Sequence, residues 1–385
     1  MLEQIKQRAK SLTSDQKWAL VIGTGLALFP IHNKWLTDIT AVEGQATLFL
    51  PAIGAVIWIM GVLSFLLNNW HKIELGEKKI YVPLIIISAS IGISGFINGT
   101  ALFDRISPLF MGVILFSSYL VTHRLGAGIF WMLIPFVIIG AIAVIVSGTI
   151  SPGNPNGGMI TNYCASAGFL IFGAIVNRGK WQWLIMLTAL IGVFFIGSME
   201  GIFIIAVVGI AVLIRRDFSK KFYITVGSIA SLAILWLALG YLIPLFQGNN
   251  NLEALTSILS GKEAINEQSI AALTTNRWNM WIESLQNIRI FGHGFSLSTT
   301  GGGTVHNLPL IIIHQVGILA GIAWLLVTIY CVVRTKWKYT WIAVIAMCIF
   351  DHYIWTQFGA LWWCLVGAST TSNIKTDLIY KEVKV

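Results

Sequence analysis

Long apolar segments, separated by short clusters of charged residues, dominate this sequence and restrict what it can fold into. Of its 385 residues, 56% are hydrophobic and 11% are charged, whereas about a quarter of the residues in a soluble globular domain are charged. The sequence therefore predicts an all-α polytopic membrane protein, formed as one integral membrane domain over residues 1–385. The net charge of +9 is spread between apolar segments instead of gathering on one soluble face, so no nucleic-acid partner is expected.

Twelve apolar segments have roughly the length of a spanning helix, although several fall short of the roughly 20 residues that an upright helix needs. They lie near residues 18–32, 46–68, 80–98, 106–122, 127–147, 160–176, 181–197, 201–214, 222–245, 307–333, 339–350 and 357–372. The cysteines are Cys164, Cys331, Cys348 and Cys364. All four fall in apolar stretches, so we expect buried packing residues and not disulfides.

Lysine and arginine are retained on the cytoplasmic side of a membrane, so their positions indicate the topology. With the N-terminus inside, all but five of the 25 Lys and Arg residues fall in cytoplasmic segments. The five others are Lys34, Arg105, Lys262, Arg277 and Arg289. Twelve spans return the C-terminus to the same side. Both termini are thus predicted to be cytoplasmic, with the polar loop over residues 246–306 on the periplasmic or exterior face of the cytoplasmic membrane.

The second half of this loop contains an amphipathic pattern. Apolar residues recur at intervals of three and four at Trp278, Trp281, Ile282, Leu285 and Ile288. This spacing predicts a helix over 276–290, and its tryptophans suit the membrane interface. We expect the helix to begin at Arg277, to carry Arg289 near its end and to stop at Gly292-His293-Gly294, since glycine accepts the left-handed conformation at a helix C-terminus.

A glycine run over 301–303, interpreted as a hinge, leads to His306-Asn307-Leu308-Pro309. Proline suits the first turn of a helix, so either His306 or Asn307 is expected to cap the helix that follows. Such a helix start favours a bound anion. His314 lies eight residues further along and is expected deeper in the membrane, as a functional residue or one that bonds to a neighbouring helix.

Three arginines are kept on the predicted outer side against the charge bias: Arg105, Arg277 and Arg289. This makes them candidates for binding an anionic substrate. The alternative for Arg105 and Arg289 is a structural ion pair with an outer carboxylate. The carboxylates considered for it are Asp104, Glu263, Glu283 and Asp351.

The spacing of residues across the loop and the next helix resembles that of a known family. The similar positions are Arg277-x-x-x-Trp281, Gly292-x-Gly294 and His306-Asn307 followed by Gly317. They are similar to the signature region of the O-antigen ligase and O-antigen polymerase superfamily. Weaker similarities are Pro152-Gly153-Asn154-Pro155-Asn156 and Asp351-His352-Tyr353-x-Trp355-Thr356.

The resemblance implies an inverting membrane glycosyltransferase that needs no nucleotide sugar. The glycan would move from a polyprenyl diphosphate carrier to a hydroxyl of a lipid or protein acceptor. A diphosphate leaving group needs positive charge, which Arg277, Arg289 and Arg105 can supply. Asn307 and His314 are the further substrate-binding candidates.

The acceptor hydroxyl needs a general base, for which His306 is the candidate and Glu200 or Asp351 the alternative. No Asp-x-Asp motif occurs in the chain, so neither a metal nor another cofactor is expected. The chain departs from the family pattern at two places. Many members carry Ser-Arg where this chain has Ser198-Met199-Glu200-Gly201. Many also carry a glutamate before the glycine of the helix after His-Asn, where this chain has His314-Gln315-Val316-Gly317.

Other functions remain open at this stage. A polymerase of the same superfamily would join repeat units instead of attaching a finished glycan. A transporter or flippase for lipid-linked glycans would use Arg105, Asp104, Glu200 and His314 along a path through the membrane. A non-catalytic membrane scaffold is the third alternative, which the missing Ser-Arg pair favours.

Overall fold

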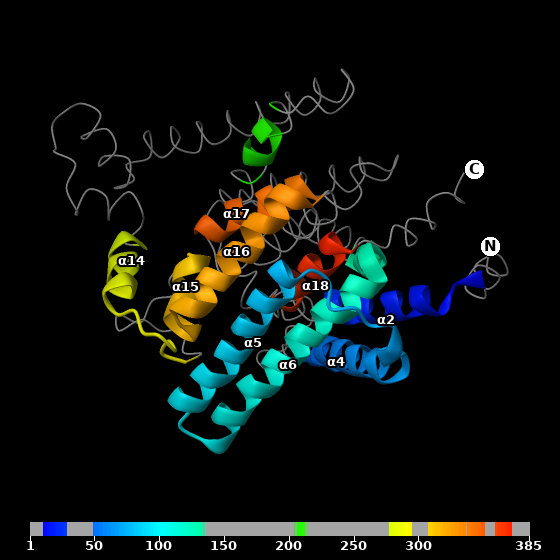
Figure 1. The fold of residues 1–385 in the computed structure, drawn as a ribbon, viewed down its shortest axis with the longest axis horizontal. Helices are drawn as coiled ribbons and strands as arrows, with labels where there is room; N and C mark the ends of the chain where they lie inside the picture. The colour runs from blue at the N-terminus through cyan, green and yellow to red at the C-terminus, as the bar shows by residue number, and fades with distance from the viewer. Residues whose placement is uncertain are drawn as a thin grey trace, which may run out of the picture.

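The computed structural model shows helices joined by turns (Figure 1). The residues that it describes are 11–28, 49–133, 135, 204, 206–211, 214, 277–294, 307–335, 337–350 and 359–371. No strand occurs among these residues, which confirms the predicted all-α fold for this part of the chain. The predicted spans near 160–176, 181–197 and 222–245 lie outside it, so the count of twelve spans stays a prediction.

The helices follow the predicted apolar segments along most of the described chain. They are α2 (Ser14–Leu28), α4 (Phe49–Asn69), α5 (Lys78–Asn98), α6 (Leu102–Leu125), α14 (Arg277–Gln286), α15 (Leu308–Val316), α16 (Ile318–Arg334), α17 (Lys338–Phe350) and α18 (Gly359–Thr370). Two short 3-10 helices, η1 (Trp70–Lys72) and η2 (Gly126–Met132), extend α4 and α6.

Three stretches of the described chain are long and apolar enough to cross a membrane. They are Ala52–Lys72, Lys78–Asn98 and Leu102–Met132. They overlap the spans predicted near 46–68, 80–98 and 106–122, and the third also includes the start of the span predicted near 127–147. Large apolar side chains such as Phe96, Phe103 and Phe110 are exposed on α5 and α6. An apolar exterior is unfavourable in water and suits hydrocarbon, and a helix satisfies its own backbone there.

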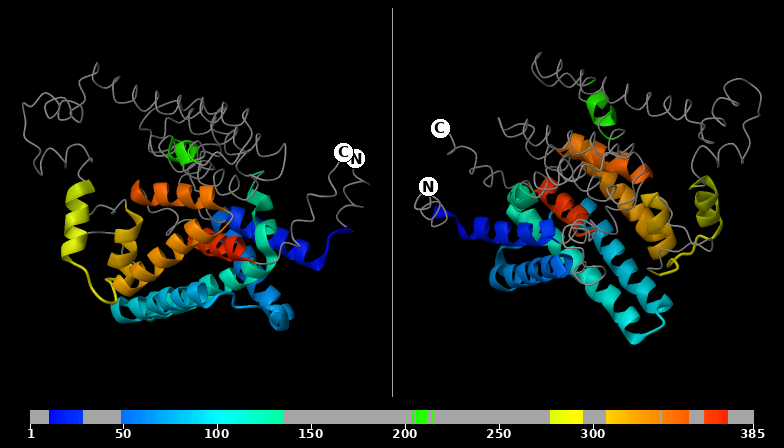
Figure 2. Two further views of the ribbon diagram at one scale, coloured as in Figure 1. Left: turned by 45° about the horizontal axis from the view of Figure 1, so that its top comes forward. Right: turned by 180° about the vertical axis from the view of Figure 1, so that it is seen from behind.

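The antiparallel pair α5 and α6 lies at the centre of the described bundle (Figures 1 and 2). Helix α16 packs along α5, and α18 packs along α6. Gly95 of α5 faces the ring of Pro108, and Gly112 of α6 faces the backbone of Ser88. Small residues at these contacts let the two backbones approach closely, as is common where lipid supplies no hydrophobic force between helices.

Aromatic side chains fill the core between α16, α17 and α18. Trp341, Trp362 and Trp363 are fully buried, and Trp324 stacks on Trp362 with the ring centroids 6.2 Å apart. The same core contains Cys331, Cys348 and Cys364 as buried thiols, which confirms the packing role predicted for them. Cys164 lies outside the described residues.

The single span predicted over 307–333 is wrong, because the chain breaks at Gly317 into α15 and α16. Gly317 has φ of 108° and ψ of 168°, a conformation essentially restricted to glycine. The two helices fold back on each other in a V, so that Gly321 of α16 packs against Ile313 of α15 (Figure 2). Hydropathy alone does not detect this break, since the segments 308–313 and 318–327 on its two sides are apolar.

Helix α16 runs antiparallel to α5 from this break. At its start, the Gln315 carbonyl accepts a hydrogen bond of 2.6 Å from Ser94, near the end of α5. Towards its other end, the Tyr330 hydroxyl donates to Glu77, just before α5, at 2.6 Å. The α15–α16 vertex therefore lies at the same end of the bundle as the turn between α5 and α6.

Candidate functional site

Three segments that are far apart in the sequence meet where α5 turns into α6. We call this region the mouth, and it comprises residues 94–105, 290–294 and 314–317. The Ser94 hydroxyl and the Gly294 amide both donate to the Gln315 carbonyl oxygen, at 2.6 and 3.1 Å. The Asn98 side-chain amide donates to the Gly292 carbonyl oxygen at 3.4 Å. The polar loop is thereby fastened to α5 and to the α15–α16 vertex.

The predicted helix over 276–290 is present as α14, but it ends at Gln286, before Gly292. Gly292 and Gly294 have φ of 66° and 86°. These glycines allow the backbone of residues 292–294 to approach α15 closely, and they do not end α14 as predicted. A β-carbon on Gly292 would collide with the Gln315 carbonyl. The glycines are therefore needed for the contact with α15.

Two histidines stack at the mouth. The rings of His293 and His314 are 4.4 Å apart between centroids and 19° from parallel. The His293 amide donates to the His314 carbonyl at 2.8 Å, and its ring Nε2 donates to the Asn287 carbonyl at 2.6 Å. His314 Nδ1 is buried and has no hydrogen-bond partner among the described residues. His314 thus lies at the mouth, in the last turn of α15, and its depth in the membrane stays a prediction.

Helices α14 and α15 pack against each other and run in the same direction (Figures 1 and 2). The residues that follow α14 contact the last turn of α15, so both helices begin at the other end of the pair, away from the mouth. The candidate residues are thus divided into two groups. Arg277 and Asn307 begin the two helices, whereas Arg289, His293 and His314 lie towards the mouth.

Asn307 is the N-cap of α15, which decides between the two predicted caps. Its side-chain oxygen accepts from the Leu310 amide at 3.2 Å, and its side-chain nitrogen donates to the Ile349 carbonyl of α17 at 3.2 Å. Pro309 has no N–H, and the Ile311 amide already donates to the Asn307 carbonyl. Among residues 308–311, the Leu308 N–H is the donor without a hydrogen-bond partner in the described part of the chain, and Leu308 itself is buried.

Arg105 is exposed and is held on the α5–α6 turn. Its Nε donates to the Gly99 carbonyl at 2.8 Å. The neighbouring Asp104 is engaged elsewhere, because its Oδ2 accepts from the Thr100 hydroxyl at 3.1 Å and from the Ala101 amide at 3.2 Å. The alternative of an Arg105–Asp104 ion pair is therefore wrong. Arg289 is exposed as well, and no ion pair joins it to a described carboxylate.

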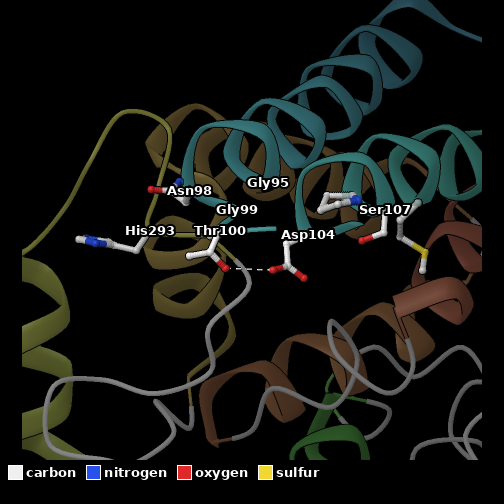
Figure 3. A pocket seen from close by; sticks show the side chains of 10 residues that line it. Gly95, Asn98, Gly99, Thr100, Asp104, Ser107 and His293 are labelled. Atoms are coloured by element: carbon white, nitrogen blue, oxygen red, sulfur yellow. Dashed lines mark hydrogen bonds between the residues drawn. The ribbon is translucent and has the colours of Figure 1, made fainter. Parts of the chain in front are cut away.

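A cavity of about 450 Å³ opens at the mouth between the α5–α6 turn and the Gly294 segment. Figure 3 shows Thr100, Asp104 and Ser107 along one wall, with Asp104 between the other two. The ring of His293 points away from Asp104, so this residue borders the cavity without directing its imidazole into it. The described lining contains one carboxylate and no lysine or arginine.

The other predicted site residues cannot be located in the same way. His306, Glu200 and Asp351 lie outside the described residues, and only the backbone of Arg277 is described. Sequence reasoning did not select His293, Thr100 or Ser107 as site residues. The sequence around His293 could have indicated a site, since a histidine between two glycines is typical of a close contact between backbone segments. The sequence of the cavity wall gave no such indication, because serine and threonine are common in apolar helices.

Comparison of the chain with protein-family models, with curated proteins and with solved structures gave no match. The functional argument therefore depends on the residues and on the geometry of the described part of the chain.

Replacing Asn307 with alanine is expected to lower the free energy of unfolding by about 1 kcal/mol, because α15 loses its cap. The loss should appear as a lower unfolding temperature of the purified protein in detergent. Asn307→Asp keeps the oxygen that accepts from Leu310 but loses the donor to Ile349, so a smaller decrease is expected. Equal unfolding temperatures for Asn307→Ala and the wild type would contradict the capping role.

Proposed function

We propose that the chain is a membrane glycosyltransferase similar to the O-antigen ligases. It moves a glycan from a polyprenyl diphosphate carrier to a hydroxyl of a lipid or protein acceptor, on the outer face of the cytoplasmic membrane. The observation that carries the proposal is the parallel packing of α14 and α15. Both helices begin at the same end of the pair, at Arg277 and at the cap Asn307, and these two residues also begin the two halves of the pattern that resembles the family.

This arrangement suits a diphosphate for two electrostatic reasons. The N-terminal end of each helix carries a partial positive charge, and two parallel helices present these ends side by side. Arg277 adds a guanidinium whose planar fork matches phosphate oxygens. A diphosphate can thus be held by the charge of Arg277 and by the two helix starts together.

The proposed reaction then needs one base. The acceptor hydroxyl oxygen bonds to the anomeric carbon while the bond from that carbon to the phosphate oxygen breaks. The hydroxyl proton passes to His306, and the polyprenyl diphosphate leaves with the electron pair of the broken bond. His306 directly precedes the Asn307 cap in the sequence, which supports its assignment as the base near the proposed diphosphate site.

The test is transfer by the purified protein in detergent, where no membrane gradient exists. A labelled polyprenyl-diphosphate glycan is supplied with a lipid or protein acceptor, and attachment of the label to the acceptor is measured. Attachment of one glycan supports a ligase, whereas a ladder of longer glycans identifies a polymerase. Absence of any transfer, together with movement of the lipid-linked glycan across vesicles that contain the protein, would replace the enzyme with a flippase.

Arg277→Lys is expected to lower the transfer rate by roughly tenfold or more, since the two-pronged contact to phosphate is lost although the charge remains. The same conservative change at Arg334, which is exposed at the far end of α16, is the matched control and should have little effect. Wild-type rates for both Arg277→Lys and Arg277→Ala would remove this arginine from the donor site.

A further inference from the structure

We infer that the cavity at the mouth is a sugar-binding subsite, which holds a sugar ring of a glycan substrate through its hydroxyl groups. This inference rests on the proposed function. It assigns a sugar, and not the diphosphate, to the cavity wall that Thr100, Asp104 and Ser107 form.

The free hydrogen-bond acceptors of the cavity wall favour a ligand whose hydroxyl groups donate. Asp104 uses Oδ2 for Thr100 and for the Ala101 amide, and its Oδ1 accepts no hydrogen bond from a described residue. The Thr100 hydroxyl donates to Asp104 and keeps its lone pairs for a ligand. Ser107 makes no side-chain hydrogen bond to the described chain and can donate or accept. Adjacent sugar hydroxyls present the complementary donors.

The same wall is unsuited to phosphate. A carboxylate repels a diphosphate, and the described lining contains no lysine or arginine to offset that repulsion. Arg105 is close in sequence, but its Nε is bound to the Gly99 carbonyl and it is not among the lining residues. A diphosphate is therefore expected at the starts of α14 and α15, and a neutral, hydroxyl-rich group at the mouth.

The shape of the cavity also fits a sugar. Gly95, Pro108 and Met111 give it an apolar side, against which the C–H face of a ring can pack. Its volume of about 450 Å³ lies within the range of roughly 300–1,000 Å³ that is typical of small-molecule sites. The capping bonds of Asp104 hold the carboxylate in place before a ligand arrives, so little side-chain entropy is lost on binding.

The distance from the helix starts, where the diphosphate is expected, to the cavity at the mouth is consistent with separate sites for diphosphate and sugar. Helix α15 has nine residues, which corresponds to a length of about 13 Å. The sugars of a glycan attached to a diphosphate at the start of α15 can extend over such a distance. An acceptor sugar also has to reach the anomeric carbon from the side away from the diphosphate. The cavity can thus receive a distal sugar of the donor or a sugar of the acceptor.

Binding of free sugars tests the subsite without any transfer reaction. The wild-type protein in lipid nanodiscs is titrated with methyl glucoside, N-acetylglucosamine and glucosamine, and contact is followed by saturation-transfer NMR. At least one sugar is expected to bind, and Asp104→Asn combined with Ser107→Ala should weaken it by roughly tenfold or more. Asparagine preserves the acceptor for the Ala101 amide, so the fold should be retained, as shown by an unchanged unfolding temperature.

Glu74→Gln is the matched control, because Glu74 is exposed at the opposite end of α5 and should not affect sugar binding. Inorganic pyrophosphate should not displace the sugar. Displacement by pyrophosphate, equal binding by the double variant, or no binding of any of the three sugars to the wild type would each overturn the subsite.

Transfer kinetics identify the source of the sugar. A higher KM for the acceptor in the double variant assigns the cavity to the acceptor, whereas a higher KM for the donor assigns it to a distal donor sugar. Unchanged values of both would overturn the subsite while leaving the proposed enzyme intact. Sugar binding without transfer by the wild type would instead retain the subsite and reject the glycosyltransferase.

Discussion

Replacing His306 with asparagine is expected to lower the rate of glycan transfer by about a hundredfold to ten-thousandfold, the usual contribution of general-base assistance. Asparagine is polar and caps helices well, but it cannot take the proton of the acceptor hydroxyl. Since Asn307 already caps α15 through the Leu310 amide, the change at position 306 should leave the helix intact. The rate is measured in detergent with saturating lipid-linked glycan.

The same substitution at His71 is the matched control. His71 is exposed in η1, at the other end of the bundle from the mouth, and His71→Asn should transfer at the wild-type rate. Donor binding should survive in His306→Asn, because the diphosphate is held by Arg277 and the helix starts. Normal turnover by His306→Asn would remove the histidine from catalysis and make Glu200 or Asp351 the leading base.

Gly317→Ala is expected to have the largest effect on the fold. The backbone at Gly317 has φ of 108° and ψ of 168°, a region in which a residue with a β-carbon loses of the order of 1–3 kcal/mol. A β-carbon there would also collide with the Ile290 carbonyl, which is backbone and cannot rotate away. Relief of the collision requires the mouth segment to separate from the α15–α16 vertex.

The expected result for Gly317→Ala is a lower unfolding temperature and loss of transfer. Gly359→Ala is the matched control, because Gly359 begins α18 and a β-carbon there would meet no atom of the described residues within 4 Å. That variant should unfold at the wild-type temperature or slightly above it, since alanine is the better helix former. A Gly317→Ala protein as stable and active as Gly359→Ala would show that the V between α15 and α16 is not required.

The positions of the helices along the sequence were largely predictable where hydrophobicity alone decides them. The segments that became α4, α5 and α6 are long and apolar, and a chain in lipid has little choice other than a helix for such a segment. The amphipathic stripe from Trp278 to Leu285 likewise predicted α14, because a repeat of three and four residues places one face against the bundle. The end of α14 was not predictable, since Gly292 serves a contact with α15.

Part of the candidate site was also predictable. Asn307 before Leu308-Pro309 is a local pattern for a helix start, and it caps α15 as one of the two predicted caps. The stacking of His314 on His293 was not predictable, because it depends on the contact between residues 290–294 and the end of α15, which are distant in sequence.

What the sequence determined by itself is the helical, apolar character of the chain, the start of α15 and the presence of a polar segment that carries arginine and histidine. These properties follow from local composition and spacing, since each depends on residues within a few turns of one another. Only the tertiary structure decided that His293 stacks on His314, that α14 and α15 begin at the same end, and that Thr100, Asp104 and Ser107 line one cavity. These features depend on backbone contacts between distant segments, where a single glycine determines how closely two chains approach.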